Sequence, residues 1–365
     1  MFSHSAAGIP KNASKIPINQ GNTVLDDSGE PELSTGSGED AFFHRSDAMG
    51  VADGVGGWAG DSKANAGLFA RRLMHHAHEE IARFDDFDDE MFVRYAEASP
   101  VEILRQAYEN TLEDFRSLDL KGSSTACIVL LRDDELRVAN LGDCGLTVVR
   151  HGDMIFRTEE QQHSFNFPYQ LGTGKHSDKP TDAQIFRLKV RKGDIIIVGS
   201  DGLFDNLFDE DILEEVNRLL PPVYRAEGGP KLKVHYSDDA ARSHSLAEST
   251  AEGEDDVDGG SSSRNTKFSD AIDKKASAPA VAPDPHQARA RLGFSLPQFH
   301  IDPKAISDAI AYRAKYVSEE SRYVSSPFQT RAIQEGLYYQ GGKKDDISVV
   351  VAIITDLEDS PDRRL

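Results

Sequence analysis

Three short polar turns, each placed between two apolar segments of strand length, constrain the fold of this chain most. They are Arg132-Asp133-Asp134, His151-Gly152-Asp153 and Arg191-Lys192-Gly193. Connections of this length join antiparallel neighbours, whereas parallel strands need a much longer crossover. The sequence therefore predicts three β-hairpins and antiparallel sheets, and it argues against the regular strand–helix alternation of a doubly wound fold.

Helices are predicted on both sides of this strand-rich region. Apolar residues at helical spacing indicate helices over 63–84, 99–118, 209–220 and 302–320. The second of these starts with Ser99 as a cap, Pro100 in the first turn and Glu102 to complete a capping box. Strands are expected at 125–131, 135–141, 145–150, 154–158, 184–190, 194–199 and 347–354.

A long polar segment interrupts this pattern. Between Ser237 and Gln287 only five large apolar residues occur, while acidic residues, serines and glycines are frequent. Such a segment cannot bury enough surface to offset the entropy of ordering it. We therefore expect a flexible arm at 1–35, one domain over 36–356 with a disordered insertion at about 225–295, and a tail at 357–365.

Charge and cysteine content limit the partners, the kind of fold and the compartment that suit this chain. The 365 residues include 62 acidic and 41 basic side chains, which gives a formal net charge of −21. This balance argues against a nucleic-acid partner, whose phosphates favour a basic surface, and suits a protein that binds divalent cations on carboxylates. Two cysteines exclude a disulfide framework and indicate a reducing compartment. No apolar run is long enough for a membrane span.

The candidate site residues lie in four acidic turns, at 38–41, 52–58, 199–205 and 342–348. Each Asp-Gly taken singly is a common turn signal. Asp53 and Asp201, however, follow apolar strand ends at 49–52 and 195–198. A carboxylate in such a place is costly unless it is paired or bound to a metal, and we see no comparable set of lysines or arginines to pair it. Together the turns predict a site for hard divalent cations.

These segments resemble the metal-dependent protein serine/threonine phosphatases of the type 2C family. The resemblance covers about 36–220 and 300–355. It rests on five segments in the family's order: Gly38-Glu39-Asp40-Ala41-Phe42-Phe43, Val51-Ala52-Asp53-Gly54-Val55-Gly56-Gly57-Trp58, Gly122-Ser123-Ser124-Thr125-Ala126, Asn140-Leu141-Gly142-Asp143-Cys144 and Asp345-Asp346-Ile347-Ser348. The first two look like the branch that includes the mitochondrial type 2C phosphatases of yeast and animals.

The resemblance implies an α+β fold, a four-layer α/β/β/α sandwich of two antiparallel sheets flanked by helices. It also implies two Mn²⁺ or Mg²⁺ ions in a cleft at one end, and a weak third ion. The residues that match the family's metal positions all offer oxygen atoms: Asp53 as the bridge, the backbone carbonyl of Gly54, Asp201 and Asp345, Glu39 and Asp40 through water, and Asp143 for the third ion. A hydroxide between the two ions would attack phosphorus in phosphoserine or phosphothreonine of protein substrates.

Two positions depart from the wider family. Val55 stands where many members have a histidine that is a proposed general acid, and Thr35 stands where many have an arginine that clamps the phosphate. The proton for the leaving group would then come from metal-bound water, another side chain or solvent. These two roles have no residue assigned from the sequence.

Alternatives to this function remain. A catalytically inactive phosphatase fold that serves as a binding module is disfavoured, because Asp53, Asp201 and Asp345 are all present. A metal-dependent phosphohydrolase of small molecules is the other alternative. The branch resemblance favours the mitochondrial matrix, with the cytoplasm as the alternative, and the oligomeric state is not predicted. His75 and His78 share a helix face, where we prefer a surface or packing role to a zinc site.

Overall fold

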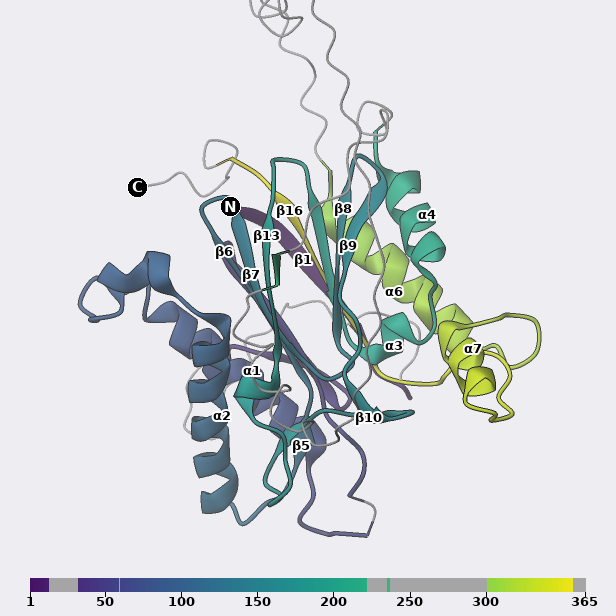
Figure 1. The fold of residues 1–365 in the computed structure, drawn as a ribbon, viewed down its shortest axis with the longest axis horizontal. Coiled ribbons are helices and arrows are strands. Elements are labelled where there is room, and N and C mark those ends of the chain that lie inside the picture. Colours follow the sequence, from purple (N-terminus) through teal and green to yellow (C-terminus); the bar gives the residue numbers. More distant parts are fainter. Residues whose placement is uncertain (13–31, 59, 222–234, 237–300, 357–365) are drawn as a thin grey trace, which may run out of the picture. The chain divides into compact units, whose positions relative to one another are not determined.

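The apolar segments of the chain pair into two antiparallel sheets (Figure 1). The computed structural model describes residues 1–12, 32–58, 60–221, 235–236 and 301–356. The larger sheet contains, in spatial order, β15 (His235–Tyr236), β13 (Gln184–Lys189), β7 (Glu135–Leu141), β6 (Ala126–Arg132), β4 (Ala48–Asp53), β3 (Asp40–His44) and β2 (Thr35–Ser37). The smaller sheet contains β1 (Phe2–Ile9), β16 (Ile347–Ile354), β14 (Ile195–Gly199), β8 (Gly145–Arg150) and β9 (Asp153–Arg157).

Shorter elements complete the described part of the chain. Two small sheets pair β10 (Gln162–Ser164) with β11 (Phe167–Pro168) and β12 (Leu171–Gly172) with β5 (Ser123–Ser124). The helices are α1 (Ala66–Ala82), α2 (Pro100–Ser117), α3 (Asp201–Phe204), α4 (Asp209–Leu219), α6 (Pro303–Glu319) and α7 (Pro327–Gln334), with 3-10 turns at Phe92–Glu97 and Pro180–Asp182. None of the helices in these described ranges has the length and apolar character needed to cross a membrane.

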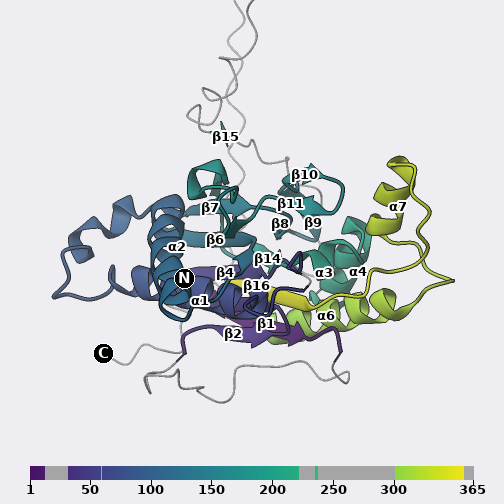
Figure 2. The ribbon, with the colours of Figure 1, turned by 90° about the horizontal axis from the view of Figure 1, so that it is seen from below.

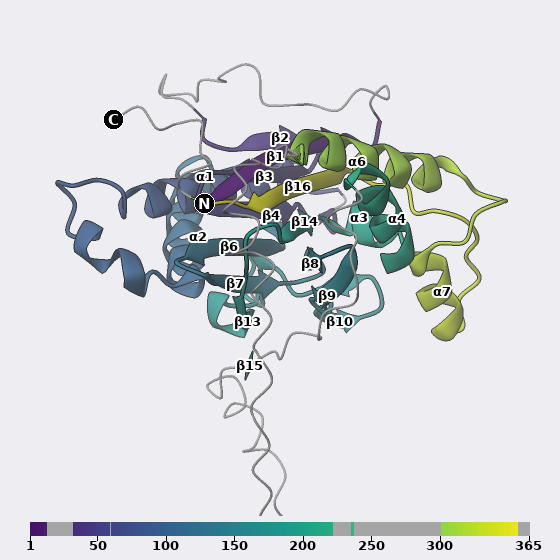
Figure 3. The same cartoon turned by 90° about the horizontal axis from the view of Figure 1, so that it is seen from above.

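The alternation of side chains along the strands produces a layered core. In β4, Met49 and Val51 belong to the apolar cluster between the sheets, whereas Ala48 and Ala52 pack with α1 and α2. Strand β16 alternates in the same way between the inter-sheet cluster and the cluster that contains α4 and α6. Figures 2 and 3 show α1 and α2 beside one sheet and α4 and α6 beside the other. The predicted α/β/β/α sandwich is confirmed.

The predicted helices are present, with ends that differ by a few residues. Helix α2 begins at Pro100 as expected, but the side chain of Ser99 forms no capping hydrogen bond. The predicted capping box is therefore wrong, and the fixed backbone of Pro100 in the first turn marks the start. Helix α1 has a side-chain cap from Asn65, whose Oδ1 accepts from the backbone N–H of Leu68 at 2.9 Å.

Two of the predicted hairpins form, and the third does not. Strands β6 and β7 pair, as do β8 and β9. Strand β13 instead pairs with β7 in the larger sheet, and β14 pairs with β8 and β16 in the smaller one. The turn at 191–193 therefore carries the chain between sheets, and the buried ion pair of Arg150 Nη2 with Asp194 Oδ2, at 2.6 Å, lies at the crossing. All of β14 is buried, which suits a central strand.

The N-terminal residues correct the expected flexible arm at 1–35. Strand β1 pairs with the full length of β16, from Phe2 opposite Ile354 to Ile9 opposite Ile347. The prediction of a flexible arm is thus wrong for these residues. Their first half is polar (Ser3 to Ser5), so the sequence pattern did not indicate a strand. The described residues do not include 13–31 of the arm, the tail or most of the insertion at about 225–295. The exception within the insertion is β15, a strand that pairs with β13.

Candidate active site

The ends of strands from both sheets bring the predicted acidic residues together. Asp40 opens β3 and Asp53 closes β4, and the two lie opposite each other in the strand register. Asp201 follows β14 and Asp345 precedes β16, and these two strands are paired neighbours. Asp143 follows β7. Each of these other four carboxylates repels the carboxylate of Asp53, so the five aspartate side chains form one acidic cluster.

A cleft of about 670 Å³ opens at this cluster. Its acidic lining consists of Glu39, Asp53, Asp143, Asp178, Asp201 and Asp345. Asp40 is 1% exposed, and its Oδ2 accepts a hydrogen bond from Ser200 Oγ at 2.7 Å. The rest of the lining comes from the glycine-rich turn at 54–58 and from the segment 163–178, together with Lys11, Ser123 and Lys343.

The backbone at Asp53 and Gly54 is held by hydrogen bonds to Thr125 and to the turn that contains Glu39. The N–H of Asp53 donates to Thr125 Oγ1 at 3.1 Å, and its carbonyl accepts from the N–H of Thr125 at 2.9 Å. The N–H of Gly54 donates to the carbonyl of Glu39 at 3.1 Å. A Cβ at Gly54 would lie 2.7 Å from the carbonyl oxygens of Glu39 and Ala66, so this close approach requires glycine.

Three buried carboxylate oxygens of the cluster have no hydrogen-bond partner within the described residues. They are Oδ1 of Asp40, Asp143 and Asp201. A buried acceptor without a partner is costly, and a divalent cation is a ligand that satisfies such an oxygen. The donor set consists of carboxylate and carbonyl oxygens, which suits Mg²⁺ and Mn²⁺. The residues present therefore fit the metal centre that the family resemblance implies.

Burial and mutual repulsion shift the pKa values of these acids upward. Burial raises the pKa of Asp53, and repulsion from Asp201 and Asp40 raises it further. Burial and repulsion also raise the pKa of Asp40, where Asp346 is the main repelling charge. They raise the pKa of Asp143 as well, where Asp201 is the main repelling charge. Ionised carboxylates packed this closely are unfavourable until a positive charge binds among them. A bound cation favours the ionised form and so reverses the upward shift of the pKa values.

Two lysines contact the acidic cluster, contrary to the expectation that no such cations pair with it. Lys343 Nζ contacts Asp201 Oδ2 and lies 2.7 Å from Asp205 Oδ2 and 3.1 Å from Asp345 Oδ2. Lys11 Nζ lies 3.5 Å from Asp345 Oδ1. The position of Lys343 two residues before Asp345 was a signal in the sequence. Lys11 gave none, because 334 residues separate it from Asp345.

Asp346 is a further residue whose part in the site the sequence did not predict. Its Oδ1 accepts from the backbone N–H of Lys11 at 2.6 Å, and its Oδ2 accepts from the backbone N–H of Glu39 at 2.9 Å. Gly38 adopts a φ of +72°, which lets the turn before Glu39 approach this carboxylate. The carboxylate therefore ties the segment after β1 to the turn that presents Glu39.

The segment 163–178 brings a histidine to the cleft. His163 Nε2 lies 3.0 Å from both carboxylate oxygens of Asp178, and its ring stacks on Tyr169 with centroids 4.0 Å apart. Asp178 Oδ2 also accepts from the backbone N–H of Gln170 at 2.8 Å. The imidazole is therefore fixed by a carboxylate and an aromatic ring, with Nδ1 as its remaining nitrogen.

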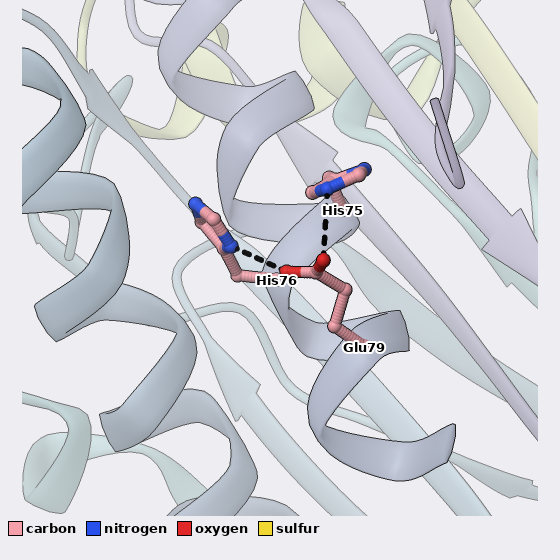
Figure 4. A group of neighbouring side chains, drawn as sticks. All are labelled: His75, His76 and Glu79. Atoms are coloured by element: carbon pink, nitrogen blue, oxygen red, sulfur yellow. Dashed lines mark hydrogen bonds and ion pairs between the residues drawn. The ribbon is translucent and has the colours of Figure 1, made fainter. Parts of the chain in front are cut away.

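A second group of side chains that could ligate a metal lies on α1, outside the cleft (Figure 4). One atom each of His75, His76 and Glu79 lies within 4.8 Å of the others. His75 Nδ1 accepts from the backbone N–H of Leu33 at 3.1 Å, which leaves the proton on the Nε2 that faces Glu79 at 3.3 Å. His76 contacts Glu79 and Asp114, at 2.8 Å each.

These contacts favour a hydrogen-bonded group over a zinc site. Burial opposes the charged form of His76, but its hydrogen bonds to Glu79 and Asp114 raise its pKa. His78, the other histidine considered for zinc, packs edge-on against Phe43 with centroids 5.5 Å apart, and burial lowers its pKa to about 4. The packing role preferred for His75 and His78 agrees with these contacts.

Comparison with known proteins places the chain among phosphatases. The family described as Protein phosphatase 2C matches residues 36–235. The chain is 38% identical over 327 residues to the "Probable protein phosphatase 2C 80" of Arabidopsis thaliana, covering 89% of this chain and 56% of that protein. It is 30% identical over 335 residues to the "Protein phosphatase PTC7 homolog" of Danio rerio, covering 88% and 83%.

A solved structure, titled "X-ray structure of the photosystem II phosphatase PBCP", aligns with 98% of this chain and all of its own. The TM-score is 0.59 at 24% identity, so this likeness concerns the fold. The chain spans 50% to 58% of the length of three Arabidopsis relatives that it matches. The PTC7 homologues among the matches agree with the branch that the sequence resembles. Sequence, fold and cleft lead to one conclusion: the chain belongs to the protein phosphatase 2C family.

Proposed function

We propose that this protein hydrolyses phosphoserine and phosphothreonine in protein substrates, with Mn²⁺ or Mg²⁺ bound in the cleft. The observation that carries the proposal is the convergence of Asp53, Asp201 and Asp345 in one cleft, together with buried carboxylate oxygens that have no hydrogen-bond partner in the described part of the chain. Membership of the protein phosphatase 2C family supports it.

Asp53, which would serve both ions, would hold the two cations together with the carbonyl of Gly54, Asp201 and Asp345. Glu39 and Asp40 would act through water, and Asp143 would hold a weak third ion. Two such cations would lower the pKa of a water between them and offset the negative charge of the phosphate.

Water is the proposed nucleophile, because the cysteines of the chain are poorly suited to attack phosphorus. Cys127 and Cys144 are both buried. Burial raises the pKa of Cys127 to about 12, and burial followed by repulsion from Asp53 raises that of Cys144. A thiol that stays protonated is a weak nucleophile. A covalent phosphoenzyme on cysteine is therefore disfavoured.

His163 is the residue we propose as proton donor in place of Val55. The leaving oxygen of serine or threonine needs a proton, and Val55 lines the cleft without being able to give one. His163 lines the same cleft, and its Nε2 donates to the carboxylate of Asp178, so Nδ1 would give up the second proton of the imidazolium form. For the phosphate clamp missing at Thr35, the cleft offers Lys11 and Lys175.

We expect His163→Gln to lower kcat on phosphopeptides about a hundredfold, the scale of general acid catalysis. Hydrolysis of 4-nitrophenyl phosphate should change much less, because its leaving group needs no proton. His176→Gln is the matched control, since His176 also lines the cleft. Equal losses on both substrates, or equal losses in both variants, would assign His163 to binding or folding instead.

The function itself is tested by a panel of phosphopeptides and phosphorylated metabolites assayed with added Mn²⁺ or Mg²⁺. We expect release of phosphate from phosphoserine and phosphothreonine peptides and complete loss of activity on chelation, because the cleft acids alone supply no positive charge to the phosphate. Activity that survives exhaustive chelation would contradict the metal centre. Preference for metabolites would support a small-molecule phosphohydrolase, and binding without turnover would support an inactive binding module.

We also propose a mitochondrial location, on the resemblance to the PTC7-type branch, with the cytoplasm as the alternative. Fractionation of cells that express the tagged chain distinguishes the two compartments.

A further inference from the structure

Lys343 is the most deeply engaged cation of the described cleft. Its side chain is 16% exposed, and its ammonium lies among the carboxylates of Asp201, Asp205 and Asp345. Burial alone would lower the pKa of Lys343, but attraction to these three acids raises it well above its usual value. Two of the three, Asp201 and Asp345, are proposed metal ligands.

The ammonium and a divalent cation need the same oxygen atoms. Lys343 Nζ contacts Oδ2 of Asp201 and lies 3.1 Å from Oδ2 of Asp345. A cation that ligates this pair would stand within a few Å of the ammonium, and in a poorly solvated cleft the two positive charges repel strongly. Asp205 has a second partner in Arg331, so it does not depend on Lys343 for charge balance. Among the described residues, Asp201 has no other cationic partner, and Asp345 has only the 3.5 Å contact with Lys11.

We propose that Lys343 is a positioning residue of the metal centre: its ammonium holds Asp201 and Asp345 together and competes with a divalent cation for them, so that the cation must displace it. This inference rests on the proposed metal site and goes beyond it. It accounts for a buried cation in a site whose chemistry calls for divalent metal. It also means that the affinity of the protein for a divalent cation depends on Lys343.

The test is the affinity for Mn²⁺ measured by calorimetry on the full chain. Lys343→Gln should bind Mn²⁺ at least tenfold more tightly than the wild type, because the competing charge is gone. The matched control is Lys344→Gln, which removes the same charge from the adjacent, exposed residue. It should change the dissociation constant by less than about twofold, since exposed charges are screened. Lys343→Arg, which keeps the charge, should stay close to the wild type.

A second measurement uses the unaltered protein, and so does not depend on the folding of a variant. Lys343 and Lys344 compete for an amine-acylating reagent with and without Mg²⁺, and mass spectrometry reports the labelling of each. Displacement of the ammonium by the cation should raise labelling of Lys343 at least threefold relative to Lys344. A purely structural lysine would show no response to the cation.

The outcomes separate this inference from the proposed function. If the wild type binds Mn²⁺, Asp53→Asn weakens that binding, and Lys343→Gln binds no more tightly than the wild type, the competition is refuted and the metal centre stands. Labelling of Lys343 that ignores Mg²⁺ refutes it as well. If the wild type binds no Mn²⁺, or if Asp53→Asn leaves the binding unchanged, the proposed metal centre itself is wrong.

Discussion

Replacement of Asp53 by asparagine is expected to lower kcat on a phosphopeptide about a thousandfold or more, equivalent to about 4 kcal/mol of transition-state stabilisation. Asp53 lies opposite Asp40 in the strand register and interacts with Asp201, Asp345 and Asp143. It is therefore the central member of the acidic cluster, and it is proposed to bridge both ions. An asparagine offers a neutral oxygen that cannot balance two divalent cations.

The matched comparison is Asp143→Asn. Asp143 is also buried, but it is proposed to hold only the weak third ion. We expect this variant to need more Mn²⁺ for half-maximal activity and to retain most of its kcat at saturation. Measurement of kcat against Mn²⁺ concentration for both variants distinguishes the two roles.

Stability is the control for Asp53→Asn. Burial and repulsion raise the pKa of Asp53, so the ionised group is unfavourable in the folded protein without metal. Removal of its charge should leave the melting temperature of the metal-free protein unchanged or higher. A folded Asp53→Asn variant with nearly normal kcat at saturating Mn²⁺ would show that the bridging role is wrong.

The second large effect is expected for Gly202→Ala. A Cβ at Gly202 would overlap the carbonyl oxygen of Asp346 and lie 2.9 Å from its carbonyl carbon. These are backbone atoms of the segment that leads into β16, a buried strand, so they cannot move aside cheaply. We expect a loss of about 3 kcal/mol in the free energy of unfolding, the upper range for overpacking. Activity should fall with it, because Gly202 follows Asp201.

Gly57→Ala, at a glycine that lines the cleft, provides the comparison. A Cβ there would meet no heavy atom within 4 Å. Its free energy of unfolding should stay within about 0.5 kcal/mol of the wild type. Thermal unfolding of both variants decides the matter: for a domain of this size, a loss of 3 kcal/mol corresponds to about 6–12 °C. Equal melting temperatures would show that the contact between Gly202 and Asp346 relaxes at little cost.

The family segments and their acids could be found from the sequence, because both depend on local patterns. Apolar periodicity located the main helices and most strands, and the turns at 132–134 and 151–153 do close hairpins. Asp53 and Asp201 stood out because each follows an apolar strand end. Glu39, Asp143 and Asp345 line the same cleft as Asp53 and Asp201.

Tertiary structure decided the features that depend on distant partners. The turn at 191–193 resembles a hairpin locally, but pairing with β7 and β16 sends its two strands to different sheets. Strand β1 is too polar in its first half to be recognised alone, and it is stabilised by the apolar strand β16.

The same reason explains the parts of the site that the sequence missed. Lys11 and Asp346 are 335 residues apart, yet the backbone N–H of one donates to the carboxylate of the other. The sequence could show that Gly202 follows a candidate ligand, but not that the backbone of Asp346 fills the place of its Cβ. Periodicity and turn chemistry act over a few residues, whereas ion pairing and close backbone contact depend on which strands the fold brings together.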